Sequence, residues 1–287
     1  WTHHKTHSRF CTEGRVCVVI MSMKSFCLNW LIVFLVWKSI SHLYRTGRQT
    51  LPLISVVIPV FNMESFLARC LDSVVSQTFQ NIEIIIVDDA SRDRSVEIIQ
   101  SYATRDRRIR LIRHDLNKGT FVARINGVSQ ARGRYVVFLD PDDFYTTNQS
   151  LLMLWHFSEL EKVDILQFSI KMVVADDPQT LNPANWLQVK PTVVRGSANI
   201  LHHFFWNSDT NAHLWNKIFR TAICKKAFSQ LPETYLICAS DTPAFFTICY
   251  FAKTFKARKT DPIISYSVGS GISTRAGELR KFSNSFS

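Results

Sequence analysis

The stretch Ile54-Ser55-Val56-Val57-Ile58-Pro59-Val60-Phe61-Asn62 decides the fold. Its first five residues are apolar and β-branched apart from one serine, which predicts a strand that is buried on both faces and stops at Pro59. A strand of this kind needs covering elements on both sides of its sheet. The residues that follow supply them, because helical patterns alternate there with further apolar runs.

The alternation continues over the next ~80 residues. Apolar residues from Met63 to Val75 recur at i, i+3, i+4, i+7 and i+8, which predicts a helix with one buried face. The other patterns predict strands at Ile82–Val87, Ile109–Arg113 and Tyr135–Leu139, and helices at 91–103 and Gly119–Ala131. This β-α-β-α-β-α-β order predicts an α/β fold of Rossmann type, with a mixed, mainly parallel sheet and helices on both faces.

Local signals weaken after Tyr145. The patterns predict helices at Ser150–Leu160, near 221–229 and over Asp241–Phe255, strands at Ile165–Met172 and Ile263–Tyr266, and a polar loop over 174–196. Large aromatic side chains gather at Trp186 and in the stretch from His202 to Trp215. Most large aromatic residues fill a core, and stacking of some of these on an acceptor sugar is the alternative.

The excess of positive charge lies at the two ends of the chain. The net charge is +11, but residues 51–250 hold twenty Lys and Arg against twenty acids. A neutral body with basic ends favours contact with a membrane surface or a polyanion, and it disfavours a nucleic-acid groove. The seven cysteines form no C-x-x-C pair, so a zinc site or a disulfide framework is not expected.

Residues 16–37 are apolar apart from Lys24, Asn29 and a few small polar positions. The uncharged part, 25–37, is shorter than the ~20 residues that a bilayer span needs. We interpret this segment as an N-terminal anchor or membrane-surface helix, which predicts a membrane-associated protein. A signal segment and a hydrophobic helix docked on the body of the protein are the alternatives.

Polar residues follow each of the four predicted strands: Asn62, then Asp88 and Asp89, then His114, Asp115 and Asn117, then Asp140, Asp142 and Asp143. Ligands of open α/β sheets bind outside the carboxyl ends of the strands, so these residues predict a binding site. Clustered aspartates suit Mg²⁺ or Mn²⁺, which keep positions for phosphate oxygens. No glycine-rich phosphate loop is present, which disfavours dinucleotide oxidoreductases and P-loop enzymes.

Residues 53–145 resemble the nucleotide-binding half of the family-2 inverting glycosyltransferases, which have the GT-A fold. The matching blocks occur in the family's order: Ser55–Asn62, Ser76–Phe79, Ile86–Ser91, Asn117–Gly119, Ala123–Gly127 and Phe138–Asp143. A looser resemblance continues through Trp215–Phe219, Ser240–Thr242 and Ile264–Thr274. Together with the N-terminal segment, this divides the chain into three predicted parts: an N-terminal basic and hydrophobic anchor and linker (1–50), a half that binds the nucleotide-sugar (51–145), and an acceptor-side lobe with the tail (146–287).

The resemblance also implies roles for single residues. Asp89 would accept a hydrogen bond from the nucleotide base, in a pocket that Pro59, Phe61 and Asn62 line. Asp140 and Asp142 match the D-x-D motif of the family. Asp140 would lie near the ribose, and the metal ligands, for Mn²⁺ or Mg²⁺, would come from Asp140, Asp142 and Asp143. Asp241 would be the general base, with Ser240 in place of the glutamate that usually precedes it in the family.

The chemistry of these residue types agrees with such roles. A divalent cation at the leaving diphosphate acts as a Lewis acid, and one base on the opposite face of the sugar gives inversion in a single displacement. An aspartate with an ordinary pKa of about 3.9 is a weak base, so we expect burial to raise the pKa of Asp241. Arg124 could add charge to the phosphate site, with a position on the helix surface as the alternative.

The expected activity is non-processive transfer of a sugar from a nucleotide-diphosphate donor, by resemblance a UDP-sugar, to a glycan or lipid-linked hydroxyl. The Q/R-x-x-R-W motif of the processive polysaccharide synthases is absent from the sequence. Two other readings remain open at this stage. One is a nucleotidyltransferase, which normally has a glycine-rich basic loop after the first strand, and the other is a relative that binds sugar nucleotide or glycan without turnover.

Overall fold

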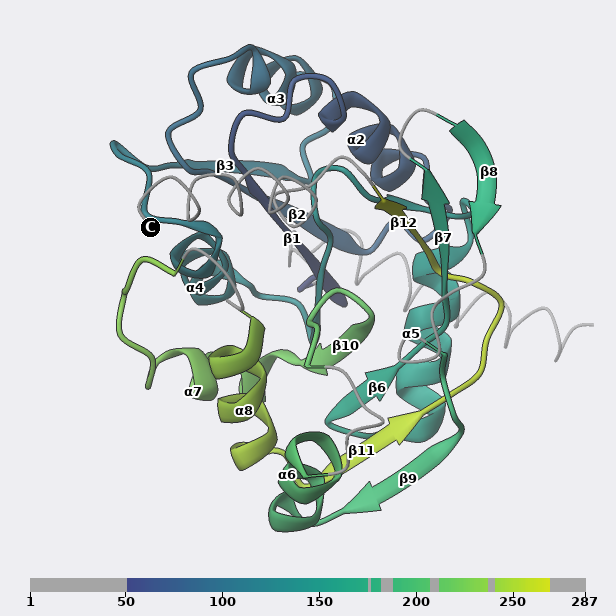
Figure 1. The fold of residues 1–287 in the computed structure, drawn as a ribbon. Helices are drawn as coiled ribbons and strands as arrows, with labels where there is room; N and C mark the ends of the chain where they lie inside the picture. Colours follow the sequence, from purple (N-terminus) through teal and green to yellow (C-terminus); the bar gives the residue numbers. More distant parts are fainter. Residues whose placement is uncertain (1–50, 175–176, 182–187, 207–211, 237–240, 269–287) are drawn as a thin grey trace, which may run out of the picture. The chain divides into compact units, whose positions relative to one another are not determined.

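The computed structural model describes residues 51–174, 177–181, 188–206, 212–236 and 241–268 (Figure 1). The predicted N-terminal segment at 16–37, Trp186 and the tail lie outside these ranges. Within them, no helix combines the length and the apolar character that crossing a membrane requires.

The first half of the chain folds as the alternating pattern predicts, except that the first strand does not stop at Pro59 but continues to Val60. Its elements are β1 (Ile54–Val60), α2 (Leu67–Val75), β2 (Ile82–Asp88), α3 (Ser95–Ala103), β3 (Ile109–Arg113), α4 (Thr120–Gln130) and β4 (Tyr135–Phe138). These strands pair in parallel in the order β3-β2-β1-β4. The alternate residues of β1 point to opposite faces, where α2 and α3 cover one and α4 covers the other (Figure 1).

The second half extends the same sheet. Its elements are β5 (Phe144–Tyr145), α5 (Ser150–Glu161), β6 (Ile165–Gln167), β7 (Ile170–Val174), β8 (Asp177–Leu181), β9 (Thr192–Arg195), α6 (Ser197–Phe205), β10 (Lys217–Arg220), α7 (Thr221–Phe228), α8 (Asp241–Phe251), β11 (Thr254–Ala257) and β12 (Ile264–Val268). The large sheet continues from β4 through β10, β6, β11 and β9. A smaller sheet has the order β5-β12-β7-β8.

Three predictions for the second half are wrong. The single strand expected at Ile165–Met172 is two strands, because β6 pairs with β10 and β11 in the large sheet whereas β7 pairs with β12 and β8 in the small one. The expected loop at 174–196 contains β8 and β9. The helix expected to reach Phe255 ends at Phe251, and β11 follows it.

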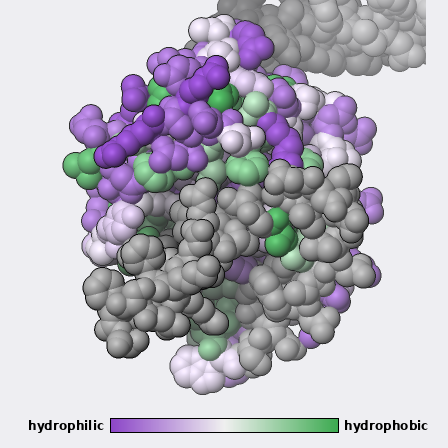
Figure 2. All heavy atoms as spheres, turned by 45° about the horizontal axis from the view of Figure 1, so that its top comes forward, coloured by the Kyte–Doolittle hydropathy of each residue, from purple (hydrophilic) through white to green (hydrophobic). Residues whose placement is uncertain are grey.

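The apolar side chains of the described residues pack into two buried clusters, and the exterior is mainly hydrophilic. Figure 2 shows that hydrophilic residues predominate on the described surface of one face, with apolar residues scattered among them. The apolar residues of β1, β2 and β4 are buried in the two clusters that lie on either side of the sheet. The polar residues of the predicted binding site therefore lie at the ends of these strands.

Helix α4 lies unusually close to the central strand. A Cβ atom added to Gly127 would lie 2.4 Å from Val57 Cγ1, which is fully buried in β1. Only glycine therefore allows this distance between helix and strand, and the close approach fixes the height of α4 above the sheet.

We predict that Gly127→Ala lowers the free energy of unfolding by about 1–3 kcal/mol, because the new methyl group overpacks a stiff, buried valine. Urea denaturation measures the change. Ser129→Ala is the matched control, because Ser129 is an exposed residue of the same helix. Equal stability of the two variants would contradict the prediction.

Candidate active site

The strand order creates a topological switch point between β1 and β4. The chain passes from β1 outward to β3 and returns to the other side of β1 as β4, so the connections after β1 and β4 diverge. Ligands of open α/β sheets bind at this kind of switch point. The residues predicted at the strand ends are therefore brought to one edge of the sheet.

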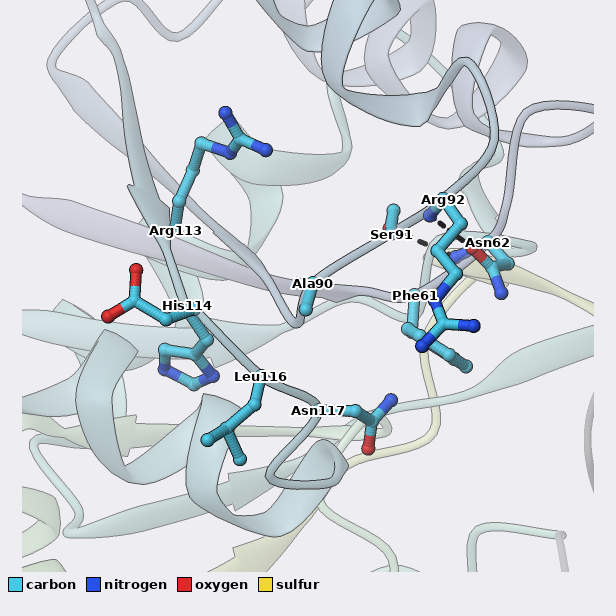
Figure 3. Close-up of a pocket in the computed structure, with 10 residues that line it drawn as sticks. Phe61, Asn62, Ala90, Ser91, Arg92, Arg113, His114, Leu116 and Asn117 are labelled. Carbon is cyan, nitrogen blue, oxygen red and sulfur yellow. Dashed lines mark hydrogen bonds between the residues drawn. The ribbon is translucent and has the colours of Figure 1, made fainter.

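A cavity of about 670 Å³ lies beside the loops that follow β1, β2 and β3 (Figure 3). Its lining comprises Phe61, Asn62, Ala90, Ser91, Arg92, Arg113, His114, Asp115, Leu116 and Asn117. Two of the predicted nucleotide-binding residues, Phe61 and Asn62, are thus part of this wall. Pro59 lies within buried β1, paired with Val87 of β2. The cavity offers aromatic, amide and guanidinium groups.

The two loops at one side of the cavity are joined to each other. Asn62 Oδ1 accepts a hydrogen bond from Arg92 N at 2.8 Å, and Asn62 N donates to Ser91 Oγ at 3.0 Å (Figure 3). Asn62 and Ala90 both have a positive φ, of 51° and 62°. Non-glycine residues in this region are strained and need the surrounding contacts to hold them. The hydrogen bonds between the two loops therefore hold this wall of the cavity.

Asp89 organises the opposite wall of the cavity. Its carboxylate accepts hydrogen bonds from Lys118 N at 2.9 Å and Gly119 N at 2.7 Å, and it contacts His114 Nδ1 at 2.7 Å. The other ring nitrogen of His114 lies 2.9 Å from Asn126 Nδ2 of α4. Asp89 is 2% exposed, so in this structure it holds the loop before α4. Its predicted contact with a nucleotide base stays a prediction.

The three carboxylates after β4 lie close to one another. Asp143 is 1% exposed, and burial, together with the charges of Asp142 and Asp140, raises its pKa well above the ordinary value. Ser267 of β12 donates its N–H to Asp143 Oδ1 at 2.8 Å and its hydroxyl to the Asp142 carbonyl at 2.7 Å. Arg69 of α2 donates to the same carbonyl at 2.9 Å. Sequence patterns did not single out Arg69 or Ser267, which lie 73 and 125 positions from Asp142.

These carboxylates fit a divalent cation that is shared with a phosphate group. In the part of the chain that the structure describes, Asp143 Oδ2 is buried and accepts no hydrogen bond. Across the described part of the chain, no group of three or more His, Cys, Asp or Glu side chains is arranged to hold a metal ion by itself. Mg²⁺ and Mn²⁺ are commonly bound through one or two carboxylates plus substrate phosphates, and this donor set suits that arrangement.

Arg124 is buried, so the alternative of a helix-surface position is wrong. Its side chain is 5% exposed, and it donates to Asp140 Oδ1 at 2.7 Å and to Asp241 Oδ1. Burial disfavours the charge on the guanidinium, but Asp241 and Asp140 override this effect and raise the pKa of Arg124. One guanidinium thus joins α4, the end of β4 and the start of α8. The predicted base and the first aspartate of the D-x-D motif meet through it.

The expectation that burial raises the pKa of Asp241 is wrong. Burial does act in that direction, but Arg124, His213 and the Leu214 N–H together lower the pKa well below its ordinary value. Leu214 N donates to Asp241 Oδ2 at 3.0 Å, and His213 Nδ1 lies 3.8 Å from the same oxygen. Asp241 is therefore a firmly ionised carboxylate whose two oxygens are both held.

An aromatic stack lies beside this carboxylate. The ring of Trp215 stacks between His213, with a centroid distance of 5.2 Å, and Tyr266, at 4.7 Å. Trp215 is 4% exposed, and Phe204 is buried as well. The expectation that large aromatics mostly fill the core holds for these two residues, since neither presents a ring face to solvent.

An open, mainly parallel sheet with a carboxylate cluster at its switch point is typical of proteins that bind nucleotide diphosphates. The sequence profile of glycosyl transferase family 2 matches residues 55–226, which is more than half of the chain. The chain belongs to this family.

Three similar proteins illustrate the range of relatives. The Bacillus subtilis protein EpsJ, named an uncharacterized glycosyltransferase, is 32% identical over 215 residues, which are 74% of this chain and 59% of EpsJ. The Escherichia coli protein WfaP, named UDP-Glc:alpha-D-GlcNAc-diphosphoundecaprenol beta-1,3-glucosyltransferase, is 40% identical over 39% of this chain and 43% of its own length. The crystal structure of Staphylococcus aureus TarS residues 1–349 in complex with UDP-GlcNAc superposes with a TM-score of 0.63 at 22% identity, covering 77% of this chain and 61% of that one.

The chain spans less than two thirds of the length of these relatives. The TarS likeness confirms the predicted GT-A fold.

We predict that Arg124→Met destabilises the protein by about 3–5 kcal/mol at pH 7, because two carboxylates lose a buried partner. The folded-state pKa of Asp241 lies below its unfolded value of about 3.9. The contribution is therefore present above pH ~4 and is lost as the pH falls through the folded-state pKa. The difference between wild type and variant should be largest at neutral pH and shrink in acid.

Urea denaturation between pH 7 and pH 3 measures this difference. Arg134→Met is the matched control, because Arg134 pairs with Glu159 at 2.9 Å but is half exposed. Its removal should cost less than about 1 kcal/mol. A loss for Arg124→Met that equals the loss for the control, or that does not depend on pH, would show that the buried pair is not stabilising.

Proposed function

We propose that this protein is a metal-dependent, inverting, non-processive glycosyltransferase that moves a sugar from a nucleotide-diphosphate donor to a hydroxyl of a glycan or lipid-linked acceptor. The observation that carries the proposal is the link through Arg124 between Asp140 and Asp241. It brings a carboxylate of the predicted diphosphate site and the predicted base to the two ends of one guanidinium. Membership of glycosyl transferase family 2 is independent support for a transferase.

The donor that we propose is a UDP-sugar. WfaP is named for a UDP-Glc donor, and the TarS structure holds UDP-GlcNAc, so the names of these two relatives support a uridine donor. The cavity beside Phe61, Asn62 and Arg92 offers one aromatic ring, amide groups and cations to a nucleobase. We assign it to the nucleoside part of the donor. Asp89 then serves chiefly by fixing the 114–119 loop that closes the cavity.

Asp140, Asp142 and Asp143 are proposed to hold Mn²⁺ or Mg²⁺ together with the diphosphate. When bound, the cation supplies Lewis-acid stabilisation of the negative charge that develops on the leaving group. Ser267 and Arg69 hold the backbone of this loop, so the carboxylates keep their places while like charges repel. Burial and the neighbouring carboxylates raise the pKa of Asp143, and a divalent cation at this site would favour its ionised form.

Asp241 is proposed to accept the proton of the acceptor hydroxyl. As this proton leaves, the hydroxyl oxygen bonds to the anomeric carbon, and the bond from that carbon to the phosphate oxygen breaks with its electron pair on the diphosphate. The ion pair with Arg124 lowers the pKa of Asp241 and so makes it a weaker base. A diphosphate beside Asp140 would compete for the same guanidinium, and any charge that it draws away from Asp241 raises the basicity of that carboxylate.

WfaP is named for an acceptor linked to diphosphoundecaprenol, which supports a lipid-linked acceptor as one of the two acceptor classes. An acceptor of that kind would require the protein to work at a membrane. We propose that residues 16–37 provide the membrane contact, on the sequence grounds given above.

We predict that Asp142→Ala abolishes the Mn²⁺-dependent part of UDP binding, because it removes a carboxylate from the shared metal and diphosphate site. Isothermal titration of UDP into the full chain, with and without Mn²⁺, measures the effect. Asp261→Ala is the matched control, since Asp261 is an exposed aspartate outside the cluster. UDP binding that needs neither the metal nor Asp142 would contradict the proposed diphosphate site.

We further predict that Asp241→Asn retains UDP binding but loses sugar transfer by ~10²-fold or more, because an amide cannot take up the proton. Transfer is measured from radiolabelled UDP-sugars to glycan and polyprenyl-linked acceptors. This comparison separates an enzyme from a binding protein. If wild type binds UDP with Mn²⁺ but transfers no sugar and the variant behaves identically, the reading of a relative without turnover is correct.

A further inference from the structure

Lys217, the first residue of β10, is a buried cation that the proposed mechanism does not use. It is 0% exposed, and its ammonium lies 4.8 Å from the ring centroid of Phe245 and 5.6 Å from that of Phe204. Burial lowers the pKa of Lys217 to about 7, although Cys249 and Asp241 act in the opposite direction. Lysine is rarely withdrawn from water in this way unless its donors are engaged.

The ammonium closes a tight turn next to Asp241. Lys217 Nζ donates to the His213 carbonyl at 2.7 Å and to Asn216 Oδ1 at 2.8 Å. The backbone N–H of Lys217 donates to the Leu214 carbonyl at 3.2 Å. Residue 217 thus binds the turn 213–217 through both its main chain and its side chain.

The peptide group between His213 and Leu214 connects this lysine to Asp241. Its carbonyl oxygen accepts from Lys217, and its N–H donates to Asp241 Oδ2 at 3.0 Å. A peptide group is planar, so holding the oxygen fixes the direction of the N–H on the opposite side. A positive charge at the oxygen also polarises the group and strengthens the hydrogen bond that its N–H donates.

We propose that Lys217 is a positioning residue for Asp241, acting through the His213–Leu214 peptide. The lysine sets the orientation of this peptide, and the peptide N–H then holds Asp241 Oδ2 while Arg124 holds Oδ1. Lys217 has no exposed surface, so it acts on the carboxylate and does not touch a substrate. The inference rests on the proposed function, in which Asp241 takes the proton of the acceptor.

The test compares Lys217→Met and Lys217→Gln with wild type in the full chain. We expect Lys217→Met to lower kcat by ~10- to 100-fold, because small displacements of a catalytic group have effects of this size. The donor KM and the affinity for UDP should change less than about twofold, since the nucleotide pocket is built from other elements. Lys217→Gln keeps an N–H donor on a shorter side chain, so its kcat should fall between those of wild type and Lys217→Met.

Lys256→Met is the matched control, because it also puts methionine in place of a lysine that is largely shielded from water. Lys256 of β11 pairs with Glu161 at 2.6 Å and has no contact with the turn 213–217 in the described residues. It should lose stability in thermal unfolding but keep the kcat of wild type. Equal kcat values for Lys217→Met, Lys256→Met and wild type would overturn the proposal, and so would parallel changes of kcat and KM in the Lys217 variants.

A second measurement does not depend on activity. Amide hydrogen exchange at Leu214, followed by NMR, reports whether its N–H still bonds to Asp241. We expect faster exchange in both Lys217 variants and unchanged exchange in Lys256→Met. Unchanged exchange at Leu214 would overturn the positioning role even if kcat falls.

The kcat and hydrogen-exchange measurements together distinguish failure of the proposed function from failure of the positioning role of Lys217. If wild type transfers no sugar, the proposed function fails, while the exchange at Leu214 still decides whether Lys217 orients the peptide. If wild type is active and only the Lys217 prediction fails, the glycosyltransferase proposal stands unchanged.

Discussion

The arrangement of the site depends on the ion pairs that the buried guanidinium of Arg124 forms with Asp140 and Asp241. A charge withdrawn from water is expensive unless its partners are well placed, and here they are Asp140 from the end of β4 and Asp241 from the start of α8. These residues are 16 and 117 positions away from Arg124 in sequence. The pair therefore specifies how the second half of the chain meets the first, because any other register would bury an unpaired charge.

The position of Arg124 is itself a consequence of backbone packing. Gly127 lies one turn further along α4 and allows the helix to approach Val57 closely. Helix α7 packs against the other side of α4, so residues on nearly every side of this helix are buried, among them Phe121, Val122 and Ile125. An arginine on such a helix reaches water only with difficulty. Gly127 thus allows the close packing of α4, and this packing places the charge of Arg124 at the edge of the sheet.

The first half of the fold was predictable because strands β1, β2 and β4 are buried along their whole length and the helices show clear periodicity. In the second half, helices α5 and α7 and strand β12 were also predicted. Strands β9, β10 and β11 were not, and β6 was not separated from β7, because β6, β9, β10 and β11 have three or four residues each and carry no period that separates them from loops. The site residues on the strand ends were found by position and resemblance, and the structure gathers Asp140, Asp142 and Asp143 in one place. Their predicted roles toward nucleotide and metal stay predictions.

The electrostatics of the site could not be predicted from the sequence. An amphipathic pattern gives no sign that Arg124 is buried, because arginine is mostly an exposed residue. The direction of the Asp241 pKa shift depends on contacts made by Arg124, His213 and Leu214, which lie at 27 or more positions from it. Lys217 lies in a block of the family resemblance, but nothing in that block indicates that its ammonium turns back onto the carbonyl of His213.

The two buried cations around Asp241 act on it in different ways. Arg124 binds the carboxylate directly, and a guanidinium stays charged at every accessible pH, so this contact sets the charge state of Asp241. Lys217 reaches the carboxylate only through a peptide group, and its pKa of about 7 leaves it partly neutral near physiological pH. A neutral amine still has two N–H donors, which can serve His213 O and Asn216 Oδ1. The geometry of the turn can therefore outlast the charge of the lysine, whereas the basicity of Asp241 follows wherever the guanidinium of Arg124 goes. In the proposed mechanism, a diphosphate that draws Arg124 away would raise the pKa of Asp241, while the Leu214 N–H would keep the carboxylate in place. Separate control of the charge and the position of Asp241 is what a base that its own donor substrate activates would require.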